Sequence, residues 1–201
     1  MFKSAISFAV VALLLAAAPA GATDARRNST ALPVPQPFEQ TLTLQGVGFH
    51  MTSANQASAN EVTIVPTGLS IDNAPIVRRV EGQVERAEVA DLDRDGSPEI
   101  YVYLRSAAAG AHGSLLAFSA NRRKSLSDIY LAPLADHAKA SKGYRGQDEF
   151  AVVKHRLVRR FPVYKEGDTP GAPSGGTRRL EYRLTKGEAS WVLKLDRVLA
   201  H

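Results

Sequence analysis

Residues 100–105 of the chain read Ile100-Tyr101-Val102-Tyr103-Leu104-Arg105, and this stretch decides the fold class. The three aliphatic side chains alternate with two tyrosines and an arginine, so they share one face at a period of two residues. Such alternation is typical of a half-buried strand in an antiparallel sheet. The stretch therefore predicts a β protein rather than a helical one.

The same period recurs on both sides of this strand. The clearest further runs are 41–45, 180–185 and 191–196, and weaker ones are 62–65, 76–80, 84–89, 115–120, 150–155 and 158–164. Turn-forming pairs such as Asp95-Gly96 separate the runs, and only residues 134–142 suggest a short helix, which Gly143 would end. We therefore predict an all-β fold, a single-domain antiparallel β-sandwich of about ten strands with one short helix.

The start of the chain has the layout of a secretory signal peptide. Lys3 precedes an apolar run over 5–18 and a group of small residues that ends at Ala22. That run is too short to span a bilayer, which needs about 20 residues. We expect a signal peptide over 1–22, an extended proline-containing leader over 23–40 and the sandwich domain over 41–201. The mature protein would be periplasmic and free of a membrane anchor.

Composition excludes several classes of function. The chain has no cysteine, which rules out disulfides and thiolate metal sites. Its formal net charge is +5, but the arginine doublets lie in alternating sequence where neighbouring side chains point to opposite faces. They would not form one basic stripe, so we do not expect nucleic-acid binding. The doublets are Arg78-Arg79, Arg159-Arg160 and Arg178-Arg179.

An acidic turn precedes the strand at 100–105. Asp91, Asp93 and Asp95 stand at alternate positions before Gly96, a spacing that calcium loops use. The helix-flanked calcium signature also requires a glutamate at the twelfth position, but that place is Val102, while Glu99 falls at the ninth. The alternative is a hairpin turn whose carboxylates accept backbone N–H groups. We favour the turn, and a calcium-binding envelope module remains the alternative function.

No catalytic constellation can be assembled from the sequence. Nucleophile-elbow, zinc-helix and phosphate-loop motifs are absent, and the five histidines never come at metal-ligand spacing. Asp136 and His137 are adjacent, and adjacent side chains on a short helix diverge. We therefore predict a protein that is not an enzyme and has no cofactor.

Several short sequence segments, or phrases, occur in the same order as in the PliI family, the periplasmic inhibitors of invertebrate-type (i-type) lysozyme, and the chain resembles that family. They cover nearly the whole chain beyond the leader. The phrases are ADLD at 90–93, SPEIYVY at 97–103, KSLSDIYL at 124–131, SKGY at 141–144, DEFAVV at 148–153, LVRRFPVYKEGD at 157–168, GGTR at 175–178 and GEASWVLK at 187–194.

The resemblance implies an antiparallel β-sandwich that plugs the cleft of a lysozyme with a protruding loop, and so helps evade host defence. The family pattern in that loop is serine, glycine, any residue, tyrosine. The matching positions here are Ala109, Gly110, Ala111 and His112, within a loop from Ser106 to Gly113. Gly110 is retained, whereas the serine and the tyrosine are replaced.

The two replacements differ in their physical consequences. Ala109 has no hydroxyl to donate to a carboxyl group in the cleft, and a lost hydrogen bond to such a buried group costs about 1–3 kcal/mol. His112 could take the place of the tyrosine, because a ring nitrogen can pair with a carboxylate. The alternative is a solvated loop histidine with no partner. The expected partner is a lysozyme, most simply of the i-type, and an exposed edge strand could also support a homodimer.

Overall fold

The computed structural model describes residues 35–56, 59–108 and 110–200. The expected signal peptide, most of the expected leader and Ala109 lie outside the described residues. The strands within them are β1 (Phe38–Leu44), β2 (Val47–Ser53), β3 (Asn60–Thr67), β4 (Ile76–Val80), β5 (Gln83–Ala90), β6 (Glu99–Arg105), β7 (Gly113–Asn121), β8 (Ser125–Leu131), β9 (Glu149–Val153), β10 (Arg156–Pro162), β11 (Thr177–Lys186) and β12 (Trp191–Ala200).

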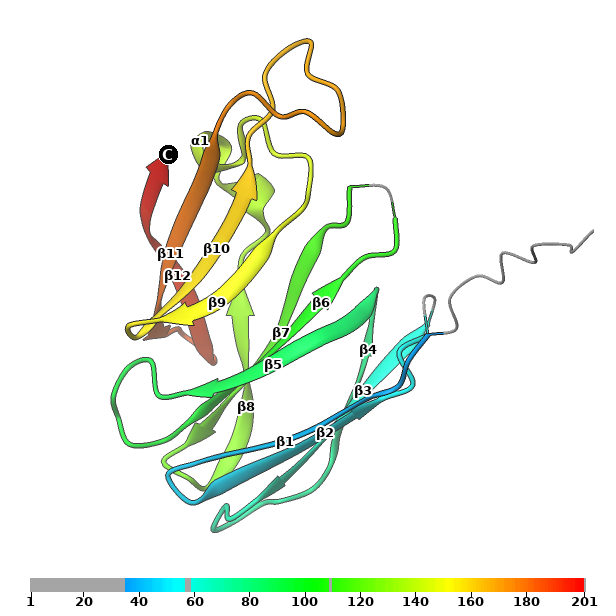
Figure 1. The fold of residues 1–201 in the computed structure, drawn as a ribbon. Helices are drawn as coiled ribbons and strands as arrows, with labels where there is room; N and C mark the ends of the chain where they lie inside the picture. The colour runs from blue at the N-terminus through cyan, green and yellow to red at the C-terminus, as the bar shows by residue number, and fades with distance from the viewer. Residues whose placement is uncertain (1–34, 57–58, 109, 201) are drawn as a thin grey trace, which may run out of the picture. The chain divides into compact units, whose positions relative to one another are not determined.

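The strands form two sheets, which confirms the predicted all-β sandwich (Figure 1). The smaller sheet has the order β1-β2-β3-β4, and the larger has the order β5-β6-β7-β8-β12-β11-β10-β9. All neighbours are antiparallel except β8 and β12, which pair in parallel. The single parallel pair arises because the chain leaves β8, forms β9 to β11 and returns to the far side of β8, a long crossover that a hairpin could not make.

Strand β6 pairs with β5 and β7, and both of its faces are buried. Ile100, Val102 and Leu104 belong to a core that includes residues of the four-stranded sheet. Tyr101 and Tyr103 point the other way, into a second core formed with β9 to β12. The larger sheet therefore folds over, and its β5–β8 half is a central layer between two others (Figure 1). The prediction that residues 100–105 are half-buried is wrong, because tyrosines can fill a second core.

The sequence did not predict two of the strands, and the first strand begins within the expected leader. β2 opens with three consecutive buried residues, Val47, Gly48 and Phe49, and alternates between buried and half-buried residues from Phe49 onward. β8 is rich in polar residues. β1 begins at Phe38, three residues before the boundary expected at 41, because Phe38 pairs with Ser53 and the Gln40 side-chain oxygen Oε1 accepts a hydrogen bond from the Ala87 N–H.

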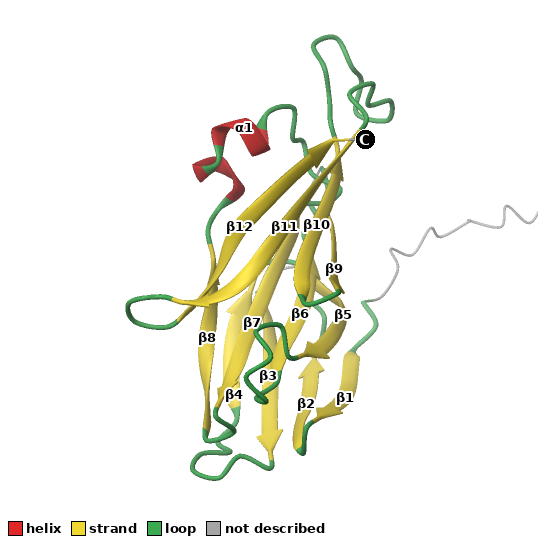
Figure 2. Ribbon diagram, turned by 90° about the vertical axis from the view of Figure 1, so that its left-hand side faces the viewer, coloured by secondary structure: helices red, strands yellow, loops and turns green. Residues whose placement is uncertain are grey.

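The predicted helix is present as two short pieces beyond the end of β8 (Figure 2). A 3-10 turn, η1 (Leu134–Asp136), and one helical turn, α1 (Ala138–Ser141), are separated by His137. Gly143 follows with a φ of +77°, a left-handed conformation that glycine adopts readily and that ends a helix. Neither piece, and no other helix in the described ranges, has the length and apolar character needed to cross a membrane.

Side chains join the two outer strands of the larger sheet, β5 and β9. The Glu88 carboxylate on β5 accepts hydrogen bonds from the Val152 N–H (2.7 Å) and the Tyr103 hydroxyl (2.6 Å). The Arg86 guanidinium donates to the Phe150 carbonyl. The sheet thus approaches a closed barrel through side chains, which leaves β9 less available for pairing with another chain.

Candidate functional site

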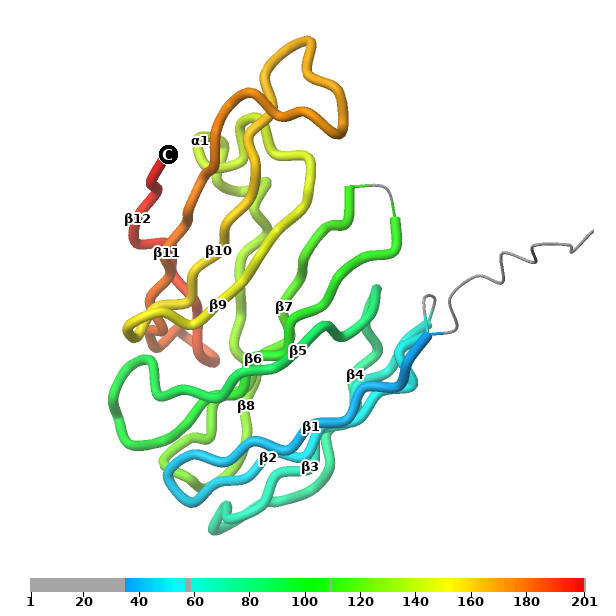
Figure 3. The backbone as a smooth tube through the Cα atoms, in the orientation of Figure 1, coloured from blue at the N-terminus to red at the C-terminus, as the bar shows by residue number. Residues whose placement is uncertain are grey.

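The candidate inhibitory loop connects β6 to β7. Its ends are held together by a hydrogen bond from the Ser106 N–H to the His112 carbonyl (2.9 Å), and the Ala111 N–H donates to the Ala108 carbonyl (3.0 Å). Ala107 and Ala108 are exposed. Figure 3 shows this connection beside the segment that precedes β9. The loop is therefore narrow, built from small residues, and closed at its base.

The segment preceding β9 braces the loop through its backbone. The Gln147 N–H donates to the carbonyl of Gly110 (2.8 Å) and approaches that of Ala111 (3.3 Å). Gly146 has a φ of +100°, and a Cβ atom at this position would overlap the Gly110 carbonyl. The two backbones can approach this closely only because residue 146 is glycine.

A buried polar network anchors the same segment beneath the loop. Asp148 and Arg159 are both buried and form an ion pair, with Arg159 Nε 2.6 Å from Asp148 Oδ1. The Tyr144 hydroxyl donates to Asp148 Oδ2 (2.5 Å) and accepts from Arg159 Nη2 (3.0 Å). His112 Nδ1 lies 3.0 Å from the same hydroxyl. His112 therefore has an intramolecular partner, which distinguishes it from the alternative of a solvated loop histidine with none.

Electrostatics keeps this network in one protonation state near neutral pH. Burial raises the pKa of Tyr144, and the hydrogen bond to Asp148 raises it further. Burial alone would lower the pKa of Arg159, but the adjacent Asp148 charge outweighs this effect, so that pKa is raised. The tyrosine thus remains neutral and the arginine charged.

The hydrogen bonds of the Tyr144 hydroxyl determine the tautomer of His112. The one proton of the Tyr144 hydroxyl is given to Asp148, so its oxygen can only accept from the histidine. His112 must therefore carry a proton on Nδ1 and donate it to Tyr144. In the neutral ring Nε2 is then a bare acceptor, and no hydrogen bond within the described residues reaches it. The exposed edge of His112 accepts when neutral and donates when protonated.

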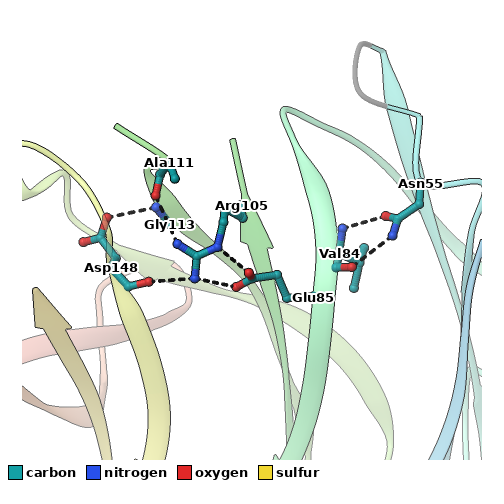
Figure 4. A network of polar contacts seen from close by, with 7 residues as sticks. All are labelled: Asn55, Val84, Glu85, Arg105, Ala111, Gly113 and Asp148. Carbon is teal, nitrogen blue, oxygen red and sulfur yellow. Dashed lines mark hydrogen bonds and ion pairs between the residues drawn. The ribbon is translucent and has the colours of Figure 1, made fainter. Parts of the chain in front are cut away.

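Arg105 ties the first arm of the loop to the same anchor (Figure 4). Its guanidinium donates to the carbonyls of Ala111 (3.2 Å) and Asp148 (3.1 Å), and it pairs with Glu85 on β5. The Gly113 N–H completes the connection by donating to Asp148 Oδ2 (2.9 Å). Both arms of the loop are thus fixed to Asp148.

The acidic turn between β5 and β6 has the local structure expected of a hairpin. The Asp91 carboxylate accepts from the N–H groups of Asp95 (3.1 Å) and Gly96 (3.1 Å), and Asp95 Oδ1 accepts from Ser97 (2.8 Å). The carboxylates of Asp91, Asp93 and Glu99 also converge, with oxygens all within 4.8 Å of one another. Glu99 thus takes the place of Asp95 in the predicted group of cation ligands. Its ninth position in the loop was the sequence feature that could have indicated it.

The sequence did not indicate Tyr144, Asp148 or Arg159 as residues of a site. Asp148 lies next to β9, whose pairing with β10 places Arg159 opposite Phe150. That register, rather than any spacing along the chain, brings the carboxylate to the guanidinium. The comparisons with known proteins add no assignment: no protein-family model, no curated protein and no solved structure matches the chain.

Proposed function

We propose that the protein is a periplasmic, non-catalytic inhibitor of lysozyme that inserts the loop from Ser106 to Gly113 into the enzyme's cleft. The i-type enzyme is the partner that the sequence resemblance suggests. The observation that carries the proposal is the combination of an exposed, small-residue loop with a buried anchor at its base. A hydrolase is less well supported, because the buried network holds a tyrosine and an ion pair rather than an activated nucleophile.

Rigidity of the loop favours binding. Ordering a flexible loop on association costs free energy, typically about 0.5–1.5 kcal/mol for each immobilised side chain. Here the hydrogen bonds from Gln147 and Arg105 already hold the backbone of the second arm. The loop would therefore enter a cleft with little additional ordering.

The chemistry of His112 suits a lysozyme cleft, which presents one protonated and one ionised carboxyl group. With Nδ1 occupied by Tyr144, neutral His112 offers Nε2 as an acceptor for the protonated carboxyl group. A protonated ring would instead donate to the ionised one. This gives a physical reason why a histidine could replace the tyrosine of the family pattern.

The positive charge of Arg145 near the loop also favours association with a lysozyme cleft. The Arg145 carbonyl adjoins Gly110, and its guanidinium donates to the Asp168 carbonyl (2.9 Å). A cation at this edge would face the acidic cleft of the enzyme. The net charge of +5 works against association with a cationic lysozyme, so the proposal requires the local field of the cleft to dominate.

The test is a titration of purified protein against invertebrate-, chicken- and goose-type lysozymes. We expect inhibition of the invertebrate type, and the proposal fails if none of the three is inhibited at micromolar concentration. His112→Ala should weaken inhibition, with His155→Ala in the β9–β10 turn as a matched control. An unchanged inhibition constant for His112→Ala would show that the loop assignment is wrong.

A further inference from the structure

The acidic turn between β5 and β6 gathers four carboxylates in a short stretch of chain. Asp91, Asp93, Asp95 and Glu99 lie within nine positions, and none of them forms an ion pair in the described part of the chain. Carboxylates that are buried elsewhere have arginine partners, as Asp148 has Arg159. Carboxylates gathered at close range repel one another unless a proton or a cation lies between them.

Glu99 is the member of this group whose position is hardest to explain by turn structure alone. Its side chain is only 1% exposed, and its Oε2 accepts one hydrogen bond, from the Leu92 N–H (2.8 Å). Burial, as the largest cause, and the charges of Asp93, Asp91 and Asp95 together raise its pKa to about 8. An ionised carboxylate is costly in such a place, whereas a carboxylate bound to a cation is not.

Tyr101 supplies an independent observation. Residues 99 and 101 alternate along β6 and so point to the same face. The Tyr101 side chain is fully buried, and its hydroxyl has no hydrogen-bond partner among the described residues. Glu99 and Asp93 are close enough to the Tyr101 hydroxyl to interact with it electrostatically. A buried donor without a partner destabilises the fold and calls for an additional oxygen nearby.

We propose that this turn binds one calcium ion through the carboxylates of Asp91, Asp93 and Glu99. These oxygens already lie within 4.8 Å of one another, and calcium takes six to eight oxygen ligands in flexible geometry. Loop carbonyls and water would complete the set, and a calcium-bound water would give the Tyr101 hydroxyl its partner. The site is separate from the β6–β7 loop and stands whether or not the protein inhibits lysozyme.

Calorimetric titration of calcium into chelator-treated protein tests the site. We expect one ion per chain and a rise in the unfolding temperature of several degrees at saturating calcium. Asp93→Asn should weaken binding at least tenfold, while keeping the local turn because the amide oxygen can still accept the Asp95 N–H. Asp72→Asn is the matched control, since Asp72 accepts the Ala74 N–H in an exposed turn elsewhere. Its affinity should equal that of the wild type.

Terbium luminescence gives a second readout that does not depend on stability. Terbium at this site should emit by energy transfer from Tyr101, and calcium should displace it more effectively than magnesium. Glu99→Gln should abolish the calcium-induced thermal shift while leaving the calcium-free protein folded. The proposal is overturned if millimolar calcium gives neither heat nor displacement of terbium, or if Asp93→Asn binds calcium as well as the wild type.

Discussion

His112 Nδ1 lies 3.0 Å from the hydroxyl oxygen of Tyr144, although the two residues are 32 positions apart in the chain. Through that hydroxyl the histidine is connected to the buried Asp148–Arg159 ion pair. The exposed loop and the protein interior are therefore one hydrogen-bonded unit. Substitutions in the buried network should therefore alter the loop and its inhibition of lysozyme.

Tyr144→Phe tests this connection. The change leaves a buried guanidinium nitrogen and His112 without their shared acceptor, so the free energy of unfolding should fall by about 1–3 kcal/mol. Inhibition of lysozyme should weaken as well, because His112 loses its orientation. Urea unfolding and inhibition assays measure the two effects. Tyr130→Phe is the control, since Tyr130 is 56% exposed, and equal behaviour of the two variants would contradict the connection.

The buried ion pair of Asp148 and Arg159 should contribute more to the free energy of unfolding than the exposed pair of Glu149 and Arg160 beside it. Asp148→Asn leaves the Arg159 charge buried and unpaired, which should lower the free energy of unfolding by about 3–5 kcal/mol. Glu149→Gln removes the partner of Arg160 at an exposed site, and should change that energy by less than about 1 kcal/mol. Urea denaturation of both variants measures the difference, and a similar loss for each would show that burial is not the deciding factor.

Gly146→Ala should displace the loop. The added methyl group would overlap the Gly110 carbonyl at a backbone conformation that alanine rarely adopts, so we expect a loss of at least about 1 kcal/mol in stability. Inhibition should fall further than stability alone explains. Gly171→Ala is the control, because a Cβ atom there meets nothing within 4 Å. Thermal unfolding and inhibition assays on both variants would reveal the effect, and an unaltered Gly146→Ala protein would refute it.

Glu99 should make stability depend on pH when divalent cations are removed. Its pKa is raised from 4.5 to about 8 in the folded protein, so the folded state binds the proton more tightly than the unfolded chain. The unfolding free energy should therefore fall as the pH rises from about 4.5 to about 8, by on the order of 1 kcal/mol per pH unit, and level off above.

Glu99→Gln should remove this slope, and Glu188→Gln at an exposed turn should not. Denaturant unfolding across that pH range measures it as the difference from the wild type, which cancels the other titrating groups. Asp91, Asp93, Asp95 and Tyr101 face Glu99 and are unchanged in both variants. Parallel pH profiles for wild type and Glu99→Gln would rule out Glu99 as the source.

The sequence predicted the all-β sandwich because alternation is a local property that ten of the strands display. It did not predict that residues 100–105 are buried on both faces, since a tyrosine can be half-exposed or can fill a second core. It also missed β2, although Val47, Phe49 and Met51 alternate with Gly48, His50 and Thr52 in that stretch. Which strand pairs with which depends on contacts distant in sequence, so the parallel β8–β12 pair could not be predicted.

The candidate sites were predictable to a lesser degree. The spacing of Asp91 and Asp93 marked the acidic turn, and Glu99 could have been included from its ninth place. The partner of His112 could not be found, because Tyr144 reaches it only through the bend that brings Gly146 against Gly110. A side chain's hydrogen-bond partners follow from such tertiary contacts.

The central claim is that the β6–β7 loop occupies the acidic cleft of a lysozyme. Ala108 is exposed near the tip of that loop, so a charge placed there should meet the cleft carboxylates directly. The decisive measurement is the inhibition constant of the wild-type, Ala108→Glu and Ala108→Lys proteins against an invertebrate-type lysozyme at low salt. We predict that the wild type inhibits and that Ala108→Glu is at least tenfold weaker than Ala108→Lys, since like charges repel in a desolvated interface. Absence of wild-type inhibition, or equal constants for the two charged variants, would contradict the claim.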